Sequence, residues 1–241
     1  MNIYAVPSIS ERLEGNSYVG RGIVIGKTPD SKKAVFAYFI MGRSQNSRNR
    51  VFVKKGDDLF TEPFDASKVV DPSLIIYAAV RTEKERVVVT NGDQTDTVVQ
   101  EKKKNGSNFY QALETRAFEP DAPNFTPRIS GQIVFSDGDF HYDMSILKSV
   151  DEKGSDCARF GFSYPSVPGL GHFLHTYVCN GDPIPTFQGE PERVAIPDSI
   201  DEFSDLLWKY LDQDNKISLY VRYTDLATKE YQDRLINKNE E

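Results

Sequence analysis

The stretch KAVFAYFIMG, residues 33–42, decides how the rest of the chain must be arranged. Successive side chains of a β-strand point to opposite faces of its sheet. Both sets are apolar here: Val35, Ala37, Phe39 and Met41 on one face, and Phe36, Tyr38 and Ile40 on the other. A strand that is apolar on both faces is covered on both. We therefore expect one layer above this sheet and another below it.

Strand-like sequence continues on both sides of this stretch. A turn containing Pro and Asp joins it to an earlier apolar run, and apolar runs bounded by turn residues recur along the chain. The expected strands cover residues 20–28, 33–42, 49–55, 73–82, 86–92, 129–147 with a DGD turn at 137–139, 157–165, 172–181 and 217–224. Asp137 and Asp139 are interpreted as residues of that turn.

Helical spacing of apolar residues appears in fewer places. It predicts helices over residues 93–106, 107–119 with Ser107 as N-cap, and 198–214, and we also expect the tail at 225–241 to be a fraying helix. Strands outnumber helices, and the helices fall between runs of strands. This order favours an α+β fold with sheets packed together and helices outside. No linker divides the chain convincingly, so we expect one domain over residues 1–241.

Composition excludes several classes of protein. The chain has 241 residues, of which 39% are hydrophobic and 27% charged, and its formal net charge is −7. This acidic balance disfavours a general nucleic-acid or membrane-surface binder. No apolar run approaches the length of a membrane span, and the first residues do not have the pattern of a signal peptide. With only Cys157 and Cys179, no disulfide framework is expected, which suits the cytoplasm.

One segment departs from the acidic average. Residues 31–56 contain no Asp or Glu, and the segment MGRSQNSRNR at 41–50 contains Arg43, Arg48 and Arg50. Arginine forks bind phosphate or carboxylate in a bidentate manner, and a loop between two strands can direct several forks to one point. The segment is therefore either a site for a small anionic ligand or a surface turn whose arginines are solvated or pair with some of the 36 acidic residues.

Other motifs accompany this arginine segment in a fixed order. They are YVGRG at 18–22, SLIIYAAVR at 73–81, NGDQTD at 91–96 and EPDAPNFTPRISG at 119–131. Together with residues 41–50, they resemble the archaeal-type IMP cyclohydrolase family over roughly the first 135 residues. The later stretch GHFLHTYVCNGDPIPTFQGEP, residues 171–191, resembles the longer bacterial members.

The resemblance implies a fold and a reaction. The fold is a four-layer αββα sandwich like that of the N-terminal-nucleophile hydrolases. The reaction closes the purine ring of 5-formamidoimidazole-4-carboxamide ribonucleotide to give inosine monophosphate (IMP) with loss of water. The resemblance implies no metal and no organic cofactor, and a small purine-precursor nucleotide as the binding partner. Genuine N-terminal-nucleophile hydrolases begin at Cys, Ser or Thr, whereas this chain begins Met1-Asn2, so we expect the cyclohydrolase rather than an amidase.

The same resemblance assigns roles to particular residues. Those expected at the reacting end are Tyr77, Glu119 and Arg50. Those expected to bind substrate are Arg21, Arg43, Ser44, Arg48, Asn91, Gly92, Thr95, Asp96, Thr126 and Arg128. Tyr77 would donate a hydrogen bond to the formyl oxygen, and Glu119 would act as general base or orient an arginine.

Each role has a structural alternative. Tyr77 fits a core position in an apolar strand. Glu119 fits a solvated acid at a helix C-terminus, although the helix dipole disfavours a negative charge there. Asn91-Gly92 fits a turn before a helix. His172, His175 and Cys179 invite a metal site, but the two histidines point to opposite faces of a strand and a fourth ligand is missing, so no metal is expected.

Three other functions remain open to the sequence. The first is a purine-nucleotide-binding protein of the same fold that has lost its chemistry or changed its substrate. The second is an amide hydrolase, which would need processing to expose a nucleophile. The third is an RNA-binding module built on residues 31–56, which the net charge of −7 disfavours. A homo-oligomer is compatible with the sequence, which does not decide the oligomeric state.

Overall fold

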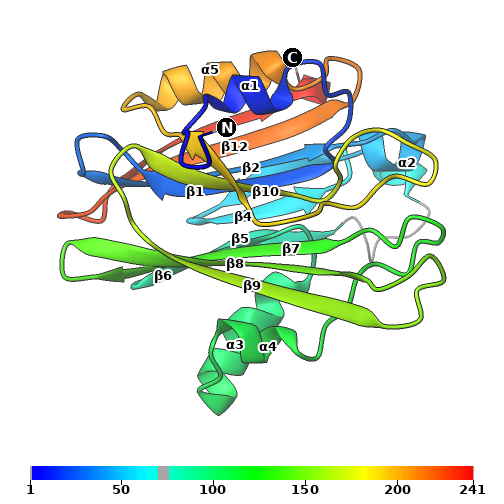
Figure 1. Cartoon of the computed structure of the whole chain (residues 1–241), viewed down its shortest axis with the longest axis horizontal. Helices are drawn as coiled ribbons and strands as arrows, with labels where there is room; N and C mark the ends of the chain where they lie inside the picture. Colours follow the sequence, from blue (N-terminus) through cyan, green and yellow to red (C-terminus); the bar gives the residue numbers. More distant parts are fainter. Residues whose placement is uncertain (1, 70–75, 241) are drawn as a thin grey trace.

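Two antiparallel β-sheets packed face to face form the centre of the structure, and helices cover the outer face of each sheet (Figure 1). The computed structural model describes residues 2–69 and 76–240. The order of layers is helix, sheet, sheet, helix. The predicted α+β class is therefore confirmed.

The first sheet has six strands in the order β11-β10-β1-β2-β12-β13. Their bounds are β1 Arg21–Lys27, β2 Lys33–Met41, β10 Leu170–His175, β11 Glu192–Ala195, β12 Lys216–Asp225 and β13 Tyr231–Asn237. The stretch that decides the fold is β2, which lies at the centre of this sheet and is buried along almost its whole length. The prediction that both of its faces are covered is confirmed.

The second sheet is a seven-stranded meander in which neighbours in sequence are neighbours in space, from β3 to β9. Its strands are β3 Val51–Lys55, β4 Asp58–Glu62, β5 Tyr77–Glu83, β6 Arg86–Thr90, β7 Arg128–Ser136, β8 Asp139–Ser149 and β9 Cys157–Pro165. Residues 73–75 of the expected strand at 73–82 lie outside the described residues, so the strand is described from Tyr77.

The helices are short and few. They are α1 Ile9–Leu13, α2 Gln45–Arg48, α3 Gln94–Asn105, α4 Phe109–Leu113 and α5 Ile200–Tyr210, with 3-10 turns at Ala66–Lys68 and Lys238–Glu240. Helices α1 and α5 cover the first sheet, and α3 and α4 cover the second (Figure 1). Within the described ranges, no helix is long and apolar enough to cross a membrane.

Three apolar clusters hold the layers together. The side chains of Phe36, Tyr38 and Ile40 belong to the cluster between the two sheets. The opposite face of β2 packs with α1 and α5, and a smaller cluster joins α3 and α4 to β6. Burial of apolar surface on both faces of each sheet is the main force that favours this arrangement.

The sequence prediction was wrong for the tail. The described part of this tail, residues 225–240, forms no α-helix: after a turn, β13 runs back along β12. Its side chains alternate, with Leu235 packed on the core between the sheets and Ile236 on the cluster under α5. This period of two is the pattern of a strand, and the pairing with β12 overrides the helical propensity of a charged tail.

Other boundaries also differ from the prediction. The expected helix at 107–119 is only α4, and its N-cap is Asn108, whose side chain accepts from the Gln111 N–H. The chain leaves the helix early and places Glu119 against Thr126 through a backbone hydrogen bond of 2.9 Å. Sequence patterns did not reveal β4, β11, α1 or α2.

Candidate active site

The arginine segment forms the short helix α2 in the connection from β2 of the first sheet to β3 of the second. Ser44 caps it by accepting from the Ser47 N–H, and Ser47 donates back to the Ser44 carbonyl. A Cβ atom at Gly42 would lie 2.5 Å from Ser47 Oγ, so the tight connection from β2 needs glycine there. The helix separates the arginines: Arg43 and Arg50 reach a pocket, whereas Arg48 is exposed.

That pocket has a volume of about 320 Å³ and lies at one end of the sandwich. It is lined by Tyr18, Arg21, Arg43, Ser44, Asn46, Ser47, Arg50, Glu119, Asp121, Asn124, Thr126, Tyr177 and Ile184. The sheet register explains the convergence. Strand β1 is antiparallel to both β2 and β10, so its first residues lie beside the ends of both neighbours, with Arg21 opposite Ile40 and Gly22 opposite His175.

Gly20 allows these segments to approach closely. Its φ of +78° lies in the left-handed region, which favours glycine. A Cβ atom there would lie 2.1 Å from Thr176 Oγ1 and 2.6 Å from Tyr177 Cδ2. The backbone before Arg21 can therefore touch the end of β10 only because residue 20 has no side chain.

Three charged groups are buried together at the inner end of the pocket. Arg21, Arg50 and Glu119 are 6%, 5% and 4% exposed, respectively, and Arg21 Nη2 lies 3.8 Å from Glu119 Oε1. Burial raises the pKa of the Glu119 carboxyl, although Arg21 and Arg128 act in the opposite direction. Burial and the neighbouring Arg21 charge lower the pKa of Arg50. Arginines stay protonated, so Glu119 is the member of the cluster that can exchange a proton.

Unpartnered polar atoms concentrate in this pocket. Among the described residues, eight buried side-chain N or O atoms have no hydrogen-bond partner, and four belong to pocket residues: Arg21 Nε, Asn46 Oδ1, Arg50 Nε and Arg50 Nη1. A buried polar group without a partner costs about 1–3 kcal/mol. Such a concentration is typical of a site whose partners arrive with a ligand.

Two tyrosine hydroxyls meet behind the arginines. Tyr38 of the first sheet and Tyr77 of the second have their oxygens 3.0 Å apart. Tyr38 is fully buried and bonds to no other acceptor in the described part of the chain. Tyr77 is the less buried of the two, at 6% exposed against 0% for Tyr38, so we assign the Tyr38 hydroxyl as the donor, because its proton would be the costlier one to leave unsatisfied. The proton of Tyr77 is then available to another acceptor.

Comparison with known proteins identifies the family of the chain. A family model described as IMP cyclohydrolase-like protein matches residues 18–230, which include all the pocket residues. The chain belongs to this family. The match also covers the later stretch at 171–191, which supplies Tyr177 and Ile184 to the pocket.

Three relatives bear the name IMP cyclohydrolase. The protein of Methanopyrus kandleri is 29% identical over 186 residues, covering 71% of this chain and 89% of that protein. The protein of Methanothrix thermoacetophila is 32% identical over 120 residues, covering 48% and 57%. The protein of Methanococcus aeolicus is 28% identical over 166 residues, covering 67% and 75%.

Of the residues expected from the family motifs, six line the pocket: Arg21, Arg43, Ser44, Arg50, Glu119 and Thr126. Arg48 does not line it. Its Nε donates to the Gly42 carbonyl at 3.1 Å and its Nη2 to Asn215 Oδ1 at 3.1 Å, so it holds the turn around α2. Tyr77 lies just behind the lining, where its hydroxyl contributes to the electrostatic environment of both buried arginines.

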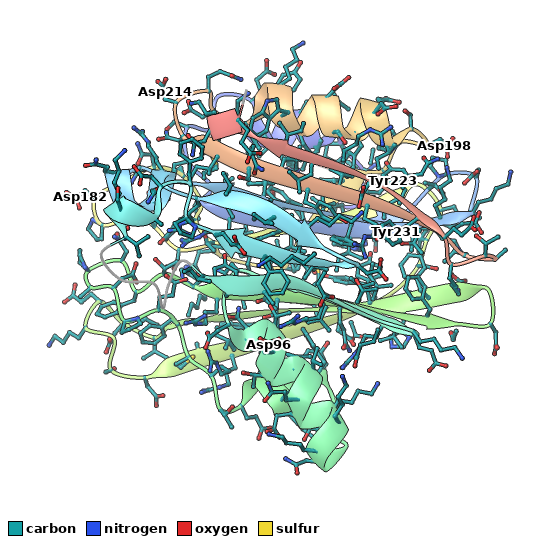
Figure 2. All side chains as sticks on the ribbon, turned by 180° about the vertical axis from the view of Figure 1, so that it is seen from behind. Asp96, Asp182, Asp198, Asp214, Tyr223 and Tyr231 are labelled. Carbon is teal, nitrogen blue, oxygen red and sulfur yellow. The ribbon has the colours of Figure 1, made fainter. Side chains whose placement is uncertain are left out.

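The motif at 91–96 lies outside the pocket lining. Asn91 accepts from the Ile129 N–H and donates to the Pro127 carbonyl, and Thr95 bonds to the Gly92 carbonyl. Asp96 pairs with Arg81 Nε at 2.7 Å. Figure 2 shows Asp96 on α3, beyond the second sheet, far from Asp182 in the loop beside α2. The motif therefore braces the segment that carries Thr126.

Arg128 belongs to the same bracing network. Its Nη1 donates to Gln94 Oε1 at 2.8 Å and lies 3.0 Å from Asp93 Oδ1. A Cβ atom at Gly92 would lie 2.0 Å from that same Nη1, which explains a glycine at this position. Arg128 thus acts on the site through the field that it exerts on Glu119.

Asn46 and Ser47, which the sequence offers as neutral donors around a phosphate, line the pocket. Several other pocket residues were not identified from the sequence: Tyr18, Asp121, Asn124, Tyr177 and Ile184. The first three lie inside the quoted motifs. Tyr177 and Ile184 lie in the later stretch, whose role only the three-dimensional arrangement reveals.

The histidines on β10 take structural partners. His172 Nδ1 lies 2.6 Å from the Tyr142 hydroxyl, and His175 Nδ1 lies 2.7 Å from the Tyr177 carbonyl. Within residues 2–69 and 76–240, no group of three His, Cys, Asp or Glu side chains is placed to hold a metal ion. Cys157 and Cys179 are both free thiols.

Proposed function

We propose that this family member is an IMP cyclohydrolase, which closes the ring of 5-formamidoimidazole-4-carboxamide ribonucleotide to IMP. The observation that carries the proposal is the pocket in which unpartnered nitrogens of Arg21 and Arg50 are buried beside Glu119. Buried hydrogen-bond donors that carry a positive charge suit an anionic, oxygen-rich ligand. The names of the relatives point to the same reaction.

The chemistry needs three actions from the protein. The carboxamide nitrogen attacks the formyl carbon, a C–N bond forms, and the formyl oxygen leaves as water with one proton from each of the two nitrogens. The carboxamide is a poor nucleophile, so the groups must be held in a near-attack geometry. Negative charge that grows on the formyl oxygen must be stabilised, and protons must be moved.

Residues in and behind the pocket suit these actions. Arg50 has two buried nitrogens without partners, and Tyr77 has a proton to donate, so both can stabilise the formyl oxygen. Glu119 can accept the proton of the attacking nitrogen, because burial raises the pKa of its carboxyl toward that of a useful base. Arg43, Ser44 and Ser47 lie on α2 and its cap, where they can hold the 5′-phosphate.

The fold and the remaining basic residues are consistent with a small nucleotide as the partner. We propose that the layer order is that of the N-terminal-nucleophile hydrolases, and that residues 1–241 work as one domain, supported by the core that both sheets share. The basic island at 31–56 does not form a continuous cationic face, because Lys54 pairs with Asp233 and Lys55 with Glu62. This supports a small anionic ligand rather than RNA.

The first experiment is a direct assay. Purified protein is mixed with the formamido ribonucleotide, and IMP is followed by ultraviolet absorbance and chromatography. We expect turnover in the natural protein. Tyr77→Phe should lower kcat about 10²–10³-fold, as for loss of one oxyanion donor, and Glu119→Gln about 10²–10⁴-fold. Glu114→Gln, an exposed acid on the same connection, is the matched control and should keep full activity.

The pH profile tests the role of Glu119 separately. Since burial raises the pKa of this carboxyl, the acid limb of kcat/KM should lie above the ordinary glutamate value of about 4.3, and Glu119→Gln should remove it. If the protein binds IMP tightly but shows no turnover, we would conclude that it is a non-catalytic or substrate-shifted nucleotide binder rather than a cyclohydrolase. Full activity of both Tyr77→Phe and Glu119→Gln would refute the assigned roles.

A further inference from the structure

A chain of three polar side chains forms one wall of the pocket. Asp121 Oδ1 accepts from the Thr126 backbone N–H at 2.6 Å, and Asp121 Oδ2 lies 2.5 Å from Thr126 Oγ1. Thr126 Oγ1 in turn lies 2.5 Å from the Tyr177 hydroxyl. The chain thus links the loop at 121–126 to the end of β10, and Asp121 and Tyr177 have no role in the assignments above.

The chemistry of the three groups fixes the direction of their hydrogen bonds. An ionised carboxylate can only accept, so the Thr126 hydroxyl donates its one proton to Asp121. Thr126 Oγ1 can then only accept from Tyr177, which must donate its own proton to Thr126. The Tyr177 oxygen retains a lone pair and no free proton. It therefore presents an acceptor to the pocket that it lines.

Tyr177 lies between the two ends of the pocket. Its ring stacks on Tyr18 with centroids 5.8 Å apart, and the Arg43 guanidinium lies 5.2 Å above the Tyr18 ring. The residue before it, Thr176, donates its N–H to the Arg21 carbonyl at 3.0 Å, so Tyr177 also lies close to the inner end. A 5′-nucleotide with its phosphate near α2 and its base near Arg21 would place its sugar at the level of Tyr177.

We propose that Tyr177 accepts a hydrogen bond from a ribose hydroxyl of the nucleotide, and that Asp121 and Thr126 act as positioning residues by holding it as an acceptor. This inference rests on the proposed function, because it takes a purine nucleotide as the ligand. It gives the site a preference for a ribose over a sugar without hydroxyls, and it adds Asp121 and Tyr177 to the specificity-determining residues.

Calorimetric binding of IMP and of 2′,3′-dideoxyinosine 5′-monophosphate tests the inference. The natural protein should bind IMP about threefold to tenfold more tightly, as expected for one neutral hydrogen bond. Tyr177→Phe should weaken IMP binding to the level of the dideoxy nucleotide and leave the latter unchanged. Tyr223→Phe changes a buried tyrosine on β12 (Figure 2) that does not line the pocket and whose hydroxyl bonds to the Pro197 carbonyl, and it should keep the full preference.

A second variant tests the linked hydrogen bonds of Asp121, Thr126 and Tyr177 without removing the tyrosine hydroxyl. Thr126→Val deletes the acceptor of the Tyr177 proton, so that the hydroxyl can rotate and donate to the pocket, and the preference for ribose should fall. A preference that survives undiminished in both Tyr177→Phe and Thr126→Val would overturn the inference. A protein that prefers ribose as expected but turns over no substrate refutes the proposed reaction and supports this inference, whereas absence of IMP binding overturns both.

Discussion

His172 illustrates how burial can fix the charge of a side chain. Its ring is stacked on Tyr164 with centroids 3.7 Å apart, and its Nδ1 faces the Tyr142 hydroxyl. Burial, with a smaller effect from Arg193, lowers the pKa of His172 to about 4. The imidazole is therefore neutral in the folded protein at every pH above that value.

This depressed pKa makes stability depend on pH. In the unfolded chain the histidine takes up a proton near pH 6.5. The contribution of His172 to the free energy of unfolding is therefore complete above that pH. It is lost as pH falls from about 6.5 to about 4, and its full size is on the order of 3 kcal/mol. We expect urea unfolding at pH 7, 5 and 4 to show that the free energy of unfolding falls less with decreasing pH in His172→Phe than in the natural protein.

A matched control separates His172 from the other titrating groups. His141 is exposed on β8, so His141→Gln should keep the pH dependence of the natural protein. Equal pH dependence in His172→Phe and the natural protein would contradict the assignment.

At the scale of elements, Asn237 joins the two sheets at their edges. It ends β13 of the first sheet, and its side chain pairs with the backbone of Phe52 on β3 of the second. The Phe52 N–H donates to Asn237 Oδ1 at 2.8 Å, and Asn237 Nδ2 donates to the Phe52 carbonyl at 3.0 Å. The Asn237 side chain thus makes the two hydrogen bonds that a neighbouring strand would make with Phe52, and in this way it connects the edge strands of two different sheets.

Asn237→Ala should therefore destabilise the fold well beyond the loss of one side chain. It leaves the N–H and the C=O of Phe52 without these partners in a buried position, where each unsatisfied group costs about 1–3 kcal/mol. We expect a loss of about 2–4 kcal/mol in the free energy of unfolding, measured with urea. Gln232→Ala, at an exposed position of the same strand, should stay within about 0.5 kcal/mol, and an equal effect of both would contradict the bridge.

Elements with a strong internal pattern could be predicted from the sequence, and elements that depend on a distant partner could not. The apolar residues of β2 follow the pattern of a buried strand, and those of α5 recur at helical spacing. The strand β13 lies in a charged tail, and only pairing with β12 makes it a strand. The motif at 91–96 was expected at the substrate from the family resemblance, but Asn91 bonds to Pro127 and Ile129, and Asp96 pairs with Arg81.

At the scale of the whole molecule, the candidate active site lowers the stability of the folded protein. Arg21 and Arg50 are two buried charges of the same sign, and Arg50 has two nitrogens without partners. Each lowers the stability of the empty protein. Among the described residues, Glu119 is the only carboxylate within ion-pair distance of Arg21, and Arg50 has none, so we expect an anionic ligand to supply the rest of the compensation.

Arg50→Met should therefore make the empty protein more stable while it destroys nucleotide binding. We expect a gain of about 1–2 kcal/mol in the free energy of unfolding, in the range of other stabilising substitutions. IMP at one hundred times its Kd should stabilise the natural protein by about 2.7 kcal/mol and the variant by almost nothing. Both quantities follow from urea unfolding with and without IMP.

Arg48→Met provides the comparison. Arg48 is exposed and has partners in Gly42 and Asn215, so its removal should give no gain in stability. A gain for Arg48→Met that equals the gain for Arg50→Met would show that removal of charge, rather than burial without partners, is responsible. From the sequence these two arginines look alike, because the residue that distinguishes them, Asn215, lies far away in the chain.

The contact between the Tyr38 and Tyr77 hydroxyls has a consequence for how the protein comes into being. Each sheet supplies one member of the pair, so neither sheet contains a complete site before the two have docked. A chain emerging from the ribosome also lacks the pocket until Tyr177 and Ile184 have been made. The nucleotide therefore cannot guide the early steps of folding and can only stabilise a chain that has already assembled both sheets.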